Sequence, residues 1–149
     1  MNDSVAVLCT RLQSSRLTEK AFRLLGGRTT LWHCLYRLFK IGTPVILACP
    51  PIEEQVFKPF LDIFPGLRLF TGYPGSPLHR MAAAVKELAP EARYVLRATH
   101  DDPLIDWVSA HTLLEKARET GVGYGIVKGL VEGGGIEVIA RENLDWAAG

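Results

Sequence analysis

The regular alternation of short apolar runs with segments of helical spacing constrains this chain most. Short runs of β-branched and other apolar residues occur at 5–9, 44–49, 67–70, 94–98, 121–127 and 136–140. Segments whose apolar residues recur every three or four positions lie at 31–39, 53–63, 78–88, 107–119 and 141–147. Such alternation predicts an α/β fold, a three-layer sandwich in which a mostly parallel sheet lies between helices joined by right-handed crossovers.

Local signals set several of the expected boundaries. Thr29 or Thr30 can cap the first helical segment, and Gly42 lies just past its end. Pro59 falls inside the second helical segment, so we expect that segment to be broken. Asp106 directly precedes the helical segment 107–119 and is expected to cap it.

Length and charge limit the classes of protein to consider. The 149 residues suit one hydrophobic core, and neither an internal repeat nor a linker is visible, so we expect a single domain covering 1–149. Lys plus Arg number 17 and Asp plus Glu number 16, which leaves a formal charge of +1. A chain without a global field is expected to bind neither nucleic acid nor an anionic membrane, so any anion site must be local.

The cysteines and the amino terminus indicate a compartment. Cys9, Cys34 and Cys49 are an odd number and lack CxxC spacing, so we expect buried thiols rather than disulfides or a zinc site. The first residues lack the basic region and long apolar run of a signal peptide. No apolar stretch approaches the roughly 20 residues of a membrane helix. We therefore expect a cytoplasmic protein.

A basic loop follows the first predicted strand. Residues 11–20 gather cations and hydroxyl groups directly after that strand, namely Arg11, Ser14, Ser15, Arg16 and Lys20. Ligands of open α/β sheets bind at the carboxyl ends of strands, and guanidinium, ammonium and hydroxyl groups suit phosphate oxygens. The loop therefore predicts a triphosphate site, although a solvated basic loop would have the same composition. No GxxxxGK[ST] motif is present.

An acidic stretch follows the strand at 94–98. Residues 100–106 read His-Asp-Asp-Pro-Leu-Ile-Asp. Carboxylates at the carboxyl end of a strand are well placed to hold Mg²⁺, which takes few protein oxygens and completes its shell with substrate phosphates. Asp101 is the metal candidate, and the alternative is an aspartate-rich turn that only caps a helix.

Three stretches together resemble a known family, the cytidylyltransferases that make CMP-activated acidic sugars, and most closely its spore-coat polysaccharide relatives. Residues 9–20 resemble the family pattern Q-A-R-x-x-S-S-R-L-P-G-K, and 24–28 resemble its Leu-x-Gly-[Gly/Lys] element. Residues 97–106 resemble R-x-T-G-D-x-P-L-I-D. Residues 134–144 resemble G-L-D-V-E-V-F-S-R-E-x-L when Glu137 is aligned with the family's glutamate. The resemblance covers most of the chain, and it implies the nucleotide-diphospho-sugar transferase fold.

The resemblance also implies an activity and a site. In such enzymes a hydroxyl of an acidic or amino sugar attacks the α-phosphorus of CTP, pyrophosphate leaves, and Mg²⁺ with basic residues balances the charge. The residues that match the nucleotide-binding motif are Arg11, Ser14, Ser15, Arg16 and Lys20, with Arg97 as a further anion contact. Asp101 would hold the metal, and Arg11, Lys20 and Asp101 would be catalytic. Glu137 could substitute as a second metal ligand. Relatives serve polysaccharide biosynthesis and often form homodimers.

Some positions depart from the family pattern. Thr18-Glu19 stand in place of Pro-Gly, His100 replaces a glycine, and Gly135 stands at the second acidic metal position. The chain also stops soon after the third motif, so we expect a shortened member. Two alternatives therefore stay open: a degenerate, non-catalytic relative that binds a nucleotide or a partner, and a glycosyltransferase that uses a nucleotide-sugar on the same fold.

Overall fold

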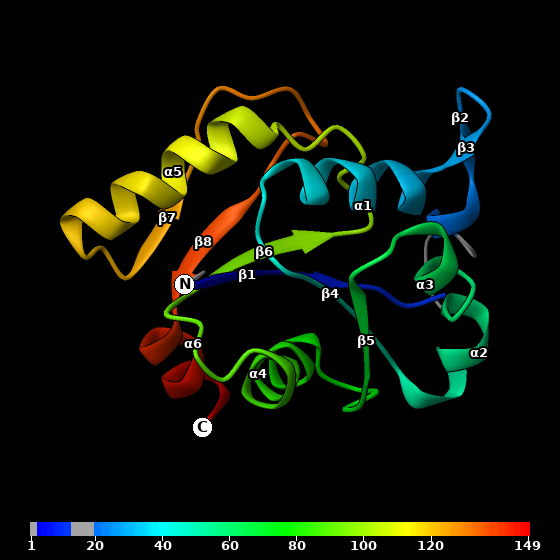
Figure 1. The fold of residues 1–149 in the computed structure, drawn as a ribbon, viewed down its shortest axis with the longest axis horizontal. Helices are drawn as coiled ribbons and strands as arrows, with labels where there is room; N and C mark the ends of the chain where they lie inside the picture. The colour runs from blue at the N-terminus through cyan, green and yellow to red at the C-terminus, as the bar shows by residue number, and fades with distance from the viewer. Residues whose placement is uncertain (1–2, 13–19) are drawn as a thin grey trace.

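A six-stranded sheet forms the centre of the computed structural model, which describes residues 3–12 and 20–149 (Figure 1). Its strand order is β5 (Leu67–Thr71), β4 (Val45–Cys49), β1 (Ser4–Cys9), β6 (Tyr94–Thr99), β8 (Glu137–Ala140) and β7 (Tyr124–Ile126). The first four strands are parallel. β8 runs antiparallel to both β6 and β7. The predicted α/β fold with a mostly parallel sheet is confirmed.

Helices cover both faces of the sheet, as Figure 1 shows. One face carries α1 (Thr30–Lys40), α2 (Glu54–Phe57), α3 (Phe60–Ile63) and α5 (Trp107–Thr120), and the other carries α4 (Pro77–Leu88) and α6 (Arg141–Ala148). The side chains of β1 alternate between the two cores, because successive residues of a strand point to opposite faces. Ala6 and Leu8 pack toward α1, whereas Val5 and Val7 pack toward α4.

The helix boundaries follow the predicted capping signals. The Thr29 hydroxyl accepts a hydrogen bond from the Trp32 amide at 3.1 Å, and Asp106 accepts from the amides of Val108 and Ser109, both at 3.1 Å. The chain between 53 and 63 forms α2 and α3 rather than one helix, with Pro59 between them. These caps and this break were predicted, because each depends on a side chain acting on its own neighbours.

Two elements differ from the sequence expectation. A hairpin of β2 (Leu24–Leu25) and β3 (Arg28–Thr29) precedes α1, and Gly26 and Gly27 form its turn with φ of 58° and 82°. The strand expected at 121–127 is only β7, because Gly121 adopts φ 68° and ends α5. Within the described residues no helix combines the length and the apolar character needed to cross a membrane.

Candidate functional site

The carboxyl ends of β1 and β6 lie side by side. The two strands pair in parallel with Cys9 opposite Thr99, so the loops that follow them leave the same edge of the sheet. This is the edge at which open α/β sheets bind ligands. Residues 11–12, where the basic loop begins, and the acidic stretch therefore leave the sheet side by side.

Lys20 and Asp101 are the pair that this edge brings together. The Lys20 ammonium lies 3.5 Å from Oδ1 of Asp101, and Nε2 of His100 lies 3.1 Å from the same oxygen. A small cavity of about 190 Å³ opens beside them and is lined by Lys20, Arg23, Thr30, His100, Asp101 and Pro103. Two basic side chains thus lie beside one half-exposed carboxylate, a setting suited to an anion that could displace the carboxylate from Lys20.

Burial favours the neutral form of His100 in this cluster. Its side chain is only 12% exposed, and burial lowers its pKa below the ordinary value, although the neighbouring Asp101 opposes that shift. A neutral imidazole can still donate from Nε2 to Asp101. Nδ1 of His100 is buried and has no hydrogen-bond partner among the described residues.

A second polar group lies where β6 pairs with β8. Arg97 and Glu137 are cross-strand partners, and their side chains form an ion pair at 2.9 Å. Thr99 donates to a carboxylate oxygen of Asp102 at 3.0 Å. Burial raises the pKa of Asp102, and the Thr99 hydrogen bond opposes the shift. Arg97 and Glu137 therefore meet each other rather than Lys20 and Asp101.

The remaining predicted site residues belong to the loop after β1. Arg11 is exposed at the start of that loop. Ser14, Ser15 and Arg16 lie outside the described residues, as does Glu19. In the described part of the chain, no group of three or more His, Cys, Asp or Glu side chains is arranged to hold a metal ion.

Sequence reasoning missed two buried charged residues beside this site. Arg80 on α4 is 1% exposed and Glu53 is 7% exposed. Arg80 donates to the carbonyl of Thr10, and Glu53 accepts from the amide of Leu12, so both bind the backbone at the start of the basic loop. A charged residue among the apolar positions of α4 was the sequence signal that could have identified Arg80. Glu53 lies shortly after Pro50 and Pro51, and no sequence signal indicated its role.

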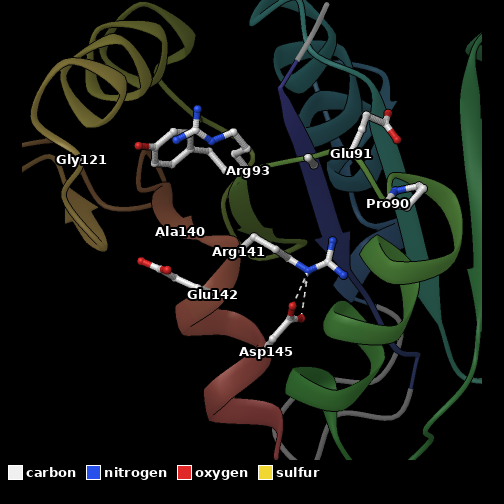
Figure 2. Close-up of a pocket in the computed structure, with 10 residues that line it drawn as sticks. Pro90, Glu91, Arg93, Gly121, Ala140, Arg141, Glu142 and Asp145 are labelled. Carbon is white, nitrogen blue, oxygen red and sulfur yellow. Dashed lines mark hydrogen bonds and ion pairs between the residues drawn. The ribbon is translucent and has the colours of Figure 1, made fainter.

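A larger hollow of about 450 Å³ lies at the opposite edge of the sheet, beside the amino end of α6 (Figure 2). Its charged side chains do not converge on one point. Figure 2 shows Arg141 turned to Asp145, whose carboxylate it contacts at 2.8 Å, while Glu142 points the other way. A ligand site needs a few convergent polar groups, so the edge with Lys20 and Asp101 is the stronger candidate.

The family follows from comparison with known proteins. A model of the family described as cytidylyltransferase matches residues 5–133. This chain belongs to the cytidylyltransferase family. No curated protein matches it in sequence.

Solved structures share the fold at low identity. A cytidylyltransferase from Leptospira borgpetersenii superposes with a TM-score of 0.80 at 20% identity over 97% of this chain and 63% of its own. A CMP:2-keto-3-deoxy-manno-octonic acid synthetase complexed with CTP gives 0.74 at 17% identity, over 97% and 77%. Rv0371c of Mycobacterium tuberculosis in complex with manganese gives 0.72 at 13%, over 97% and 74%. The chain thus spans less than two thirds of the Leptospira protein.

Proposed function

We propose that this chain binds CTP across the carboxyl ends of β1 and β6 and transfers CMP to an acidic or amino sugar, releasing pyrophosphate. The observation that carries the proposal is the meeting of Lys20 and Asp101, 3.5 Å apart, from the loops of two neighbouring strands. Membership of the cytidylyltransferase family supports the same nucleotide. A neighbour on the same fold is complexed with CTP.

The chemistry asked of the protein is mostly electrostatic. A sugar hydroxyl attacks the α-phosphorus and loses its proton to solvent, the bond to the pyrophosphate oxygen breaks, and negative charge grows on the leaving group. Arg11 and Lys20 would bind phosphate oxygens and balance that charge, together with Ser14, Ser15 and Arg16 of the same loop. Arg97 would offer a further cation once it is released from Glu137.

A divalent ion fits this edge of the sheet only if the nucleotide phosphates supply most of its ligands. Asp101 offers one half-exposed carboxylate, and no cluster of three ligands exists among the described residues. Mg²⁺ is often bound in this way, through one or two carboxylates with phosphates and water. We assign Asp101 as its protein ligand, and Glu137 as a second one if it leaves Arg97. When bound, the ion would neutralise phosphate charge, and Lys20 would turn from Asp101 to the phosphates.

Pyrophosphate release tests the proposal. The chain is incubated with CTP, Mg²⁺ and 2-keto-3-deoxy-manno-octonic acid, the sugar acid in the name of one structural neighbour, with N-acetylneuraminic acid in parallel. We expect release that depends on the sugar and is lost in Asp101→Asn. Asp145→Asn is the matched control, because Asp145 is also an exposed, ion-paired aspartate but lies on α6. Equal loss in both variants would contradict the assignment of Asp101.

A second candidate, a nucleotide-binding relative without catalysis, is favoured by one observation. Oδ1 of Asp101 is already contacted by both Lys20 and His100, and Gly135 supplies no second carboxylate. CTP binding without pyrophosphate release for either sugar would favour it. Gly135→Asp combined with Glu19→Gly is the rescue, and a Cβ at Gly135 meets no atom within 4 Å. Recovery of turnover would show that the missing ligand was the cause.

The wider setting belongs to the same proposal. CTP and activated sugars are used in the cytoplasm, and we place the chain there, in surface polysaccharide synthesis. We propose that residues 1–149 act as one domain and that the protein works as a homodimer. Sedimentation equilibrium with and without CTP measures the second point, and a monomer at all concentrations would contradict it.

A further inference from the structure

Two charged side chains are buried beside the start of the basic loop, and the proposed chemistry does not use them. Arg80 is 1% exposed and Glu53 is 7% exposed. Burying a charge is costly unless hydrogen bonds compensate for the lost water. We propose that Arg80 and Glu53 are positioning residues that fix residues 10–12, where the chain leaves β1, in the form that receives the nucleotide. This inference rests on the proposed function.

Arg80 ties two loops together through their carbonyl oxygens. Its Nε donates to the carbonyl of Gly72 at 2.9 Å. One Nη donates to the carbonyls of Tyr73 at 3.0 Å and Pro74 at 3.2 Å. The other Nη donates to the carbonyl of Thr10 at 3.5 Å. The planar, rigid fork of an arginine can serve both loops at once, which the single ammonium of a lysine cannot.

The turn bound by Arg80 has an unusual backbone. Among the described residues, Tyr73 is the one non-glycine residue with positive φ, at 44°. Such a conformation persists only where the surroundings impose it. Three guanidinium hydrogen bonds to residues 72–74 supply that constraint. Arg80 therefore holds the β5–α4 turn and, through Thr10, couples its position to the end of β1.

Glu53 holds the same loop from the side of β4. It lies in the 3-10 helix Pro51–Glu53 that follows this strand, and its Oε2 accepts from the amide of Leu12 at 2.9 Å. The amide of Thr10 donates to the carbonyl of Ala48 at 2.9 Å, so the last regular sheet contact falls two residues earlier. Where the chain leaves the sheet, residues 10–12 are thus held by Arg80 at Thr10 and by Glu53 at Leu12.

The opposite charges of the two residues also matter to a bound polyanion. Both act on the Cys49 thiol, whose pKa is raised to about 12 by burial first and by Glu53 second, while Arg80 opposes the shift. A buried glutamate alone would repel a phosphate near Leu12. The guanidinium of Arg80 offsets that repulsion, so Glu53 can bind the Leu12 amide without weakening anion binding there.

Hydrogen exchange tests the positioning role without any nucleotide. Glu53→Gln keeps an acceptor oxygen for the Leu12 amide, whereas Glu53→Ala removes it, and both remove the charge. We expect the Leu12 amide to exchange about tenfold faster in Glu53→Ala than in Glu53→Gln. Arg80→Lys should accelerate exchange in the segments around both Leu12 and Ser76. Equal exchange at Leu12 in the two Glu53 variants would overturn the inference.

Nucleotide affinity then separates positioning from mere stability. At a temperature well below every unfolding midpoint, we expect CTP to bind Glu53→Ala about tenfold more weakly than Glu53→Gln. Glu54→Gln and Arg68→Lys are matched controls, since Glu54 is only partly buried, Arg68 is exposed, and Arg68 also donates to a carbonyl, that of Leu88. Equal affinities for the two Glu53 variants contradict the inference. Failure of the unmodified chain to bind CTP would instead contradict the proposed function, and the exchange result would still decide the positioning role.

Discussion

The ends of β1 and β6 lie next to each other but are stabilised in opposite ways. Beyond β1, the backbone is held by the buried side chains of Arg80 and Glu53. Beyond β6, Asp101 is held by contacts to Lys20 and His100, and the Asp101 and Lys20 side chains are 48% and 38% exposed. The first region has a fixed backbone, and the second has charged groups that water or a ligand can reach.

This difference separates side chains that hold the fold from side chains that a ligand can contact. Buried, hydrogen-bonded charges are costly to disturb, whereas exposed ion pairs contribute at most about 1 kcal/mol and can exchange partners. A nucleotide could therefore replace Asp101 as the partner of Lys20 without disturbing the fold. It could not replace Arg80 or Glu53 in the same way.

The largest expected effect concerns Asp101. Under the proposed function, Asp101→Asn lowers the rate of CMP transfer by about 100-fold or more, since a charge that acts on the reacting phosphates is lost. Because its ion pair is exposed, the free energy of unfolding should change by less than about 1 kcal/mol. Steady-state kinetics and urea unfolding of the same preparation measure the two quantities. A large loss of stability would show that Asp101 holds the fold, as Arg80 and Glu53 do, and would contradict the difference between the ends of β1 and β6.

The next effect concerns stability at the other strand end. Arg80→Met removes the donor to one buried and three partly buried carbonyls, and we expect the free energy of unfolding to fall by about 2–3 kcal/mol. Lys20→Met should cost less than about 1 kcal/mol, because Lys20 is half exposed. Chemical denaturation compares the two variants. Similar losses would show that burial does not distinguish the two regions.

A smaller effect separates two of the three aspartates of the acidic stretch, Asp101 and Asp106. Asp106 caps α5 through the amides of Val108 and Ser109, so Asp106→Ala should lower stability by about 1 kcal/mol. CTP affinity should stay unchanged, in contrast to Asp101→Asn. Thr29→Ala, which removes the cap of α1, is the matched control. Weaker CTP binding in Asp106→Ala would extend the site beyond Asp101.

The smallest effect concerns a thiol beneath the end of β6. Cys34 is buried, its Sγ lies 3.8 Å and 3.7 Å from the carbonyls of Thr99 and His100, and burial raises its pKa from 9.0 to about 12. The folded state therefore favours the neutral thiol, and this stability is complete below pH 9 and lost as pH rises from 9 toward 12. Between pH 7 and 9.5 the loss is about 0.8 kcal/mol. Urea unfolding should show a steeper alkaline decline in the unmodified chain than in Cys34→Ala, and parallel curves would refute this.

Much of the architecture was predictable from local pattern. The buried strands, the caps at Thr29 and Asp106 and the break near Pro59 each depend on residues close together in sequence. The β2–β3 hairpin was missed because its strands have only two residues each, too few for an alternating pattern. The shortness of β7 was missed because Gly121 ends α5 inside an apolar run.

The site was predictable only in part. Strand order brings Lys20 to Asp101, and the motifs pointed to both residues. The roles of Arg80 and Glu53 depend on contacts 70 and 41 positions away along the chain, which no spacing rule reaches. The pairing of Arg97 with Glu137 likewise arises because β8 runs antiparallel to β6. The sequence pattern did not indicate the direction of that strand.

Thermal unfolding with CTP and Mg²⁺ tests the central claim most directly. Binding to the folded state alone stabilises it by about 2.7 kcal/mol at a hundredfold excess over Kd, which raises the melting temperature by several degrees for a domain of this size. We predict that rise for CTP with Mg²⁺, a smaller one for ATP, and its loss in Lys20→Met combined with Asp101→Asn. An unchanged melting temperature at millimolar CTP would contradict the account.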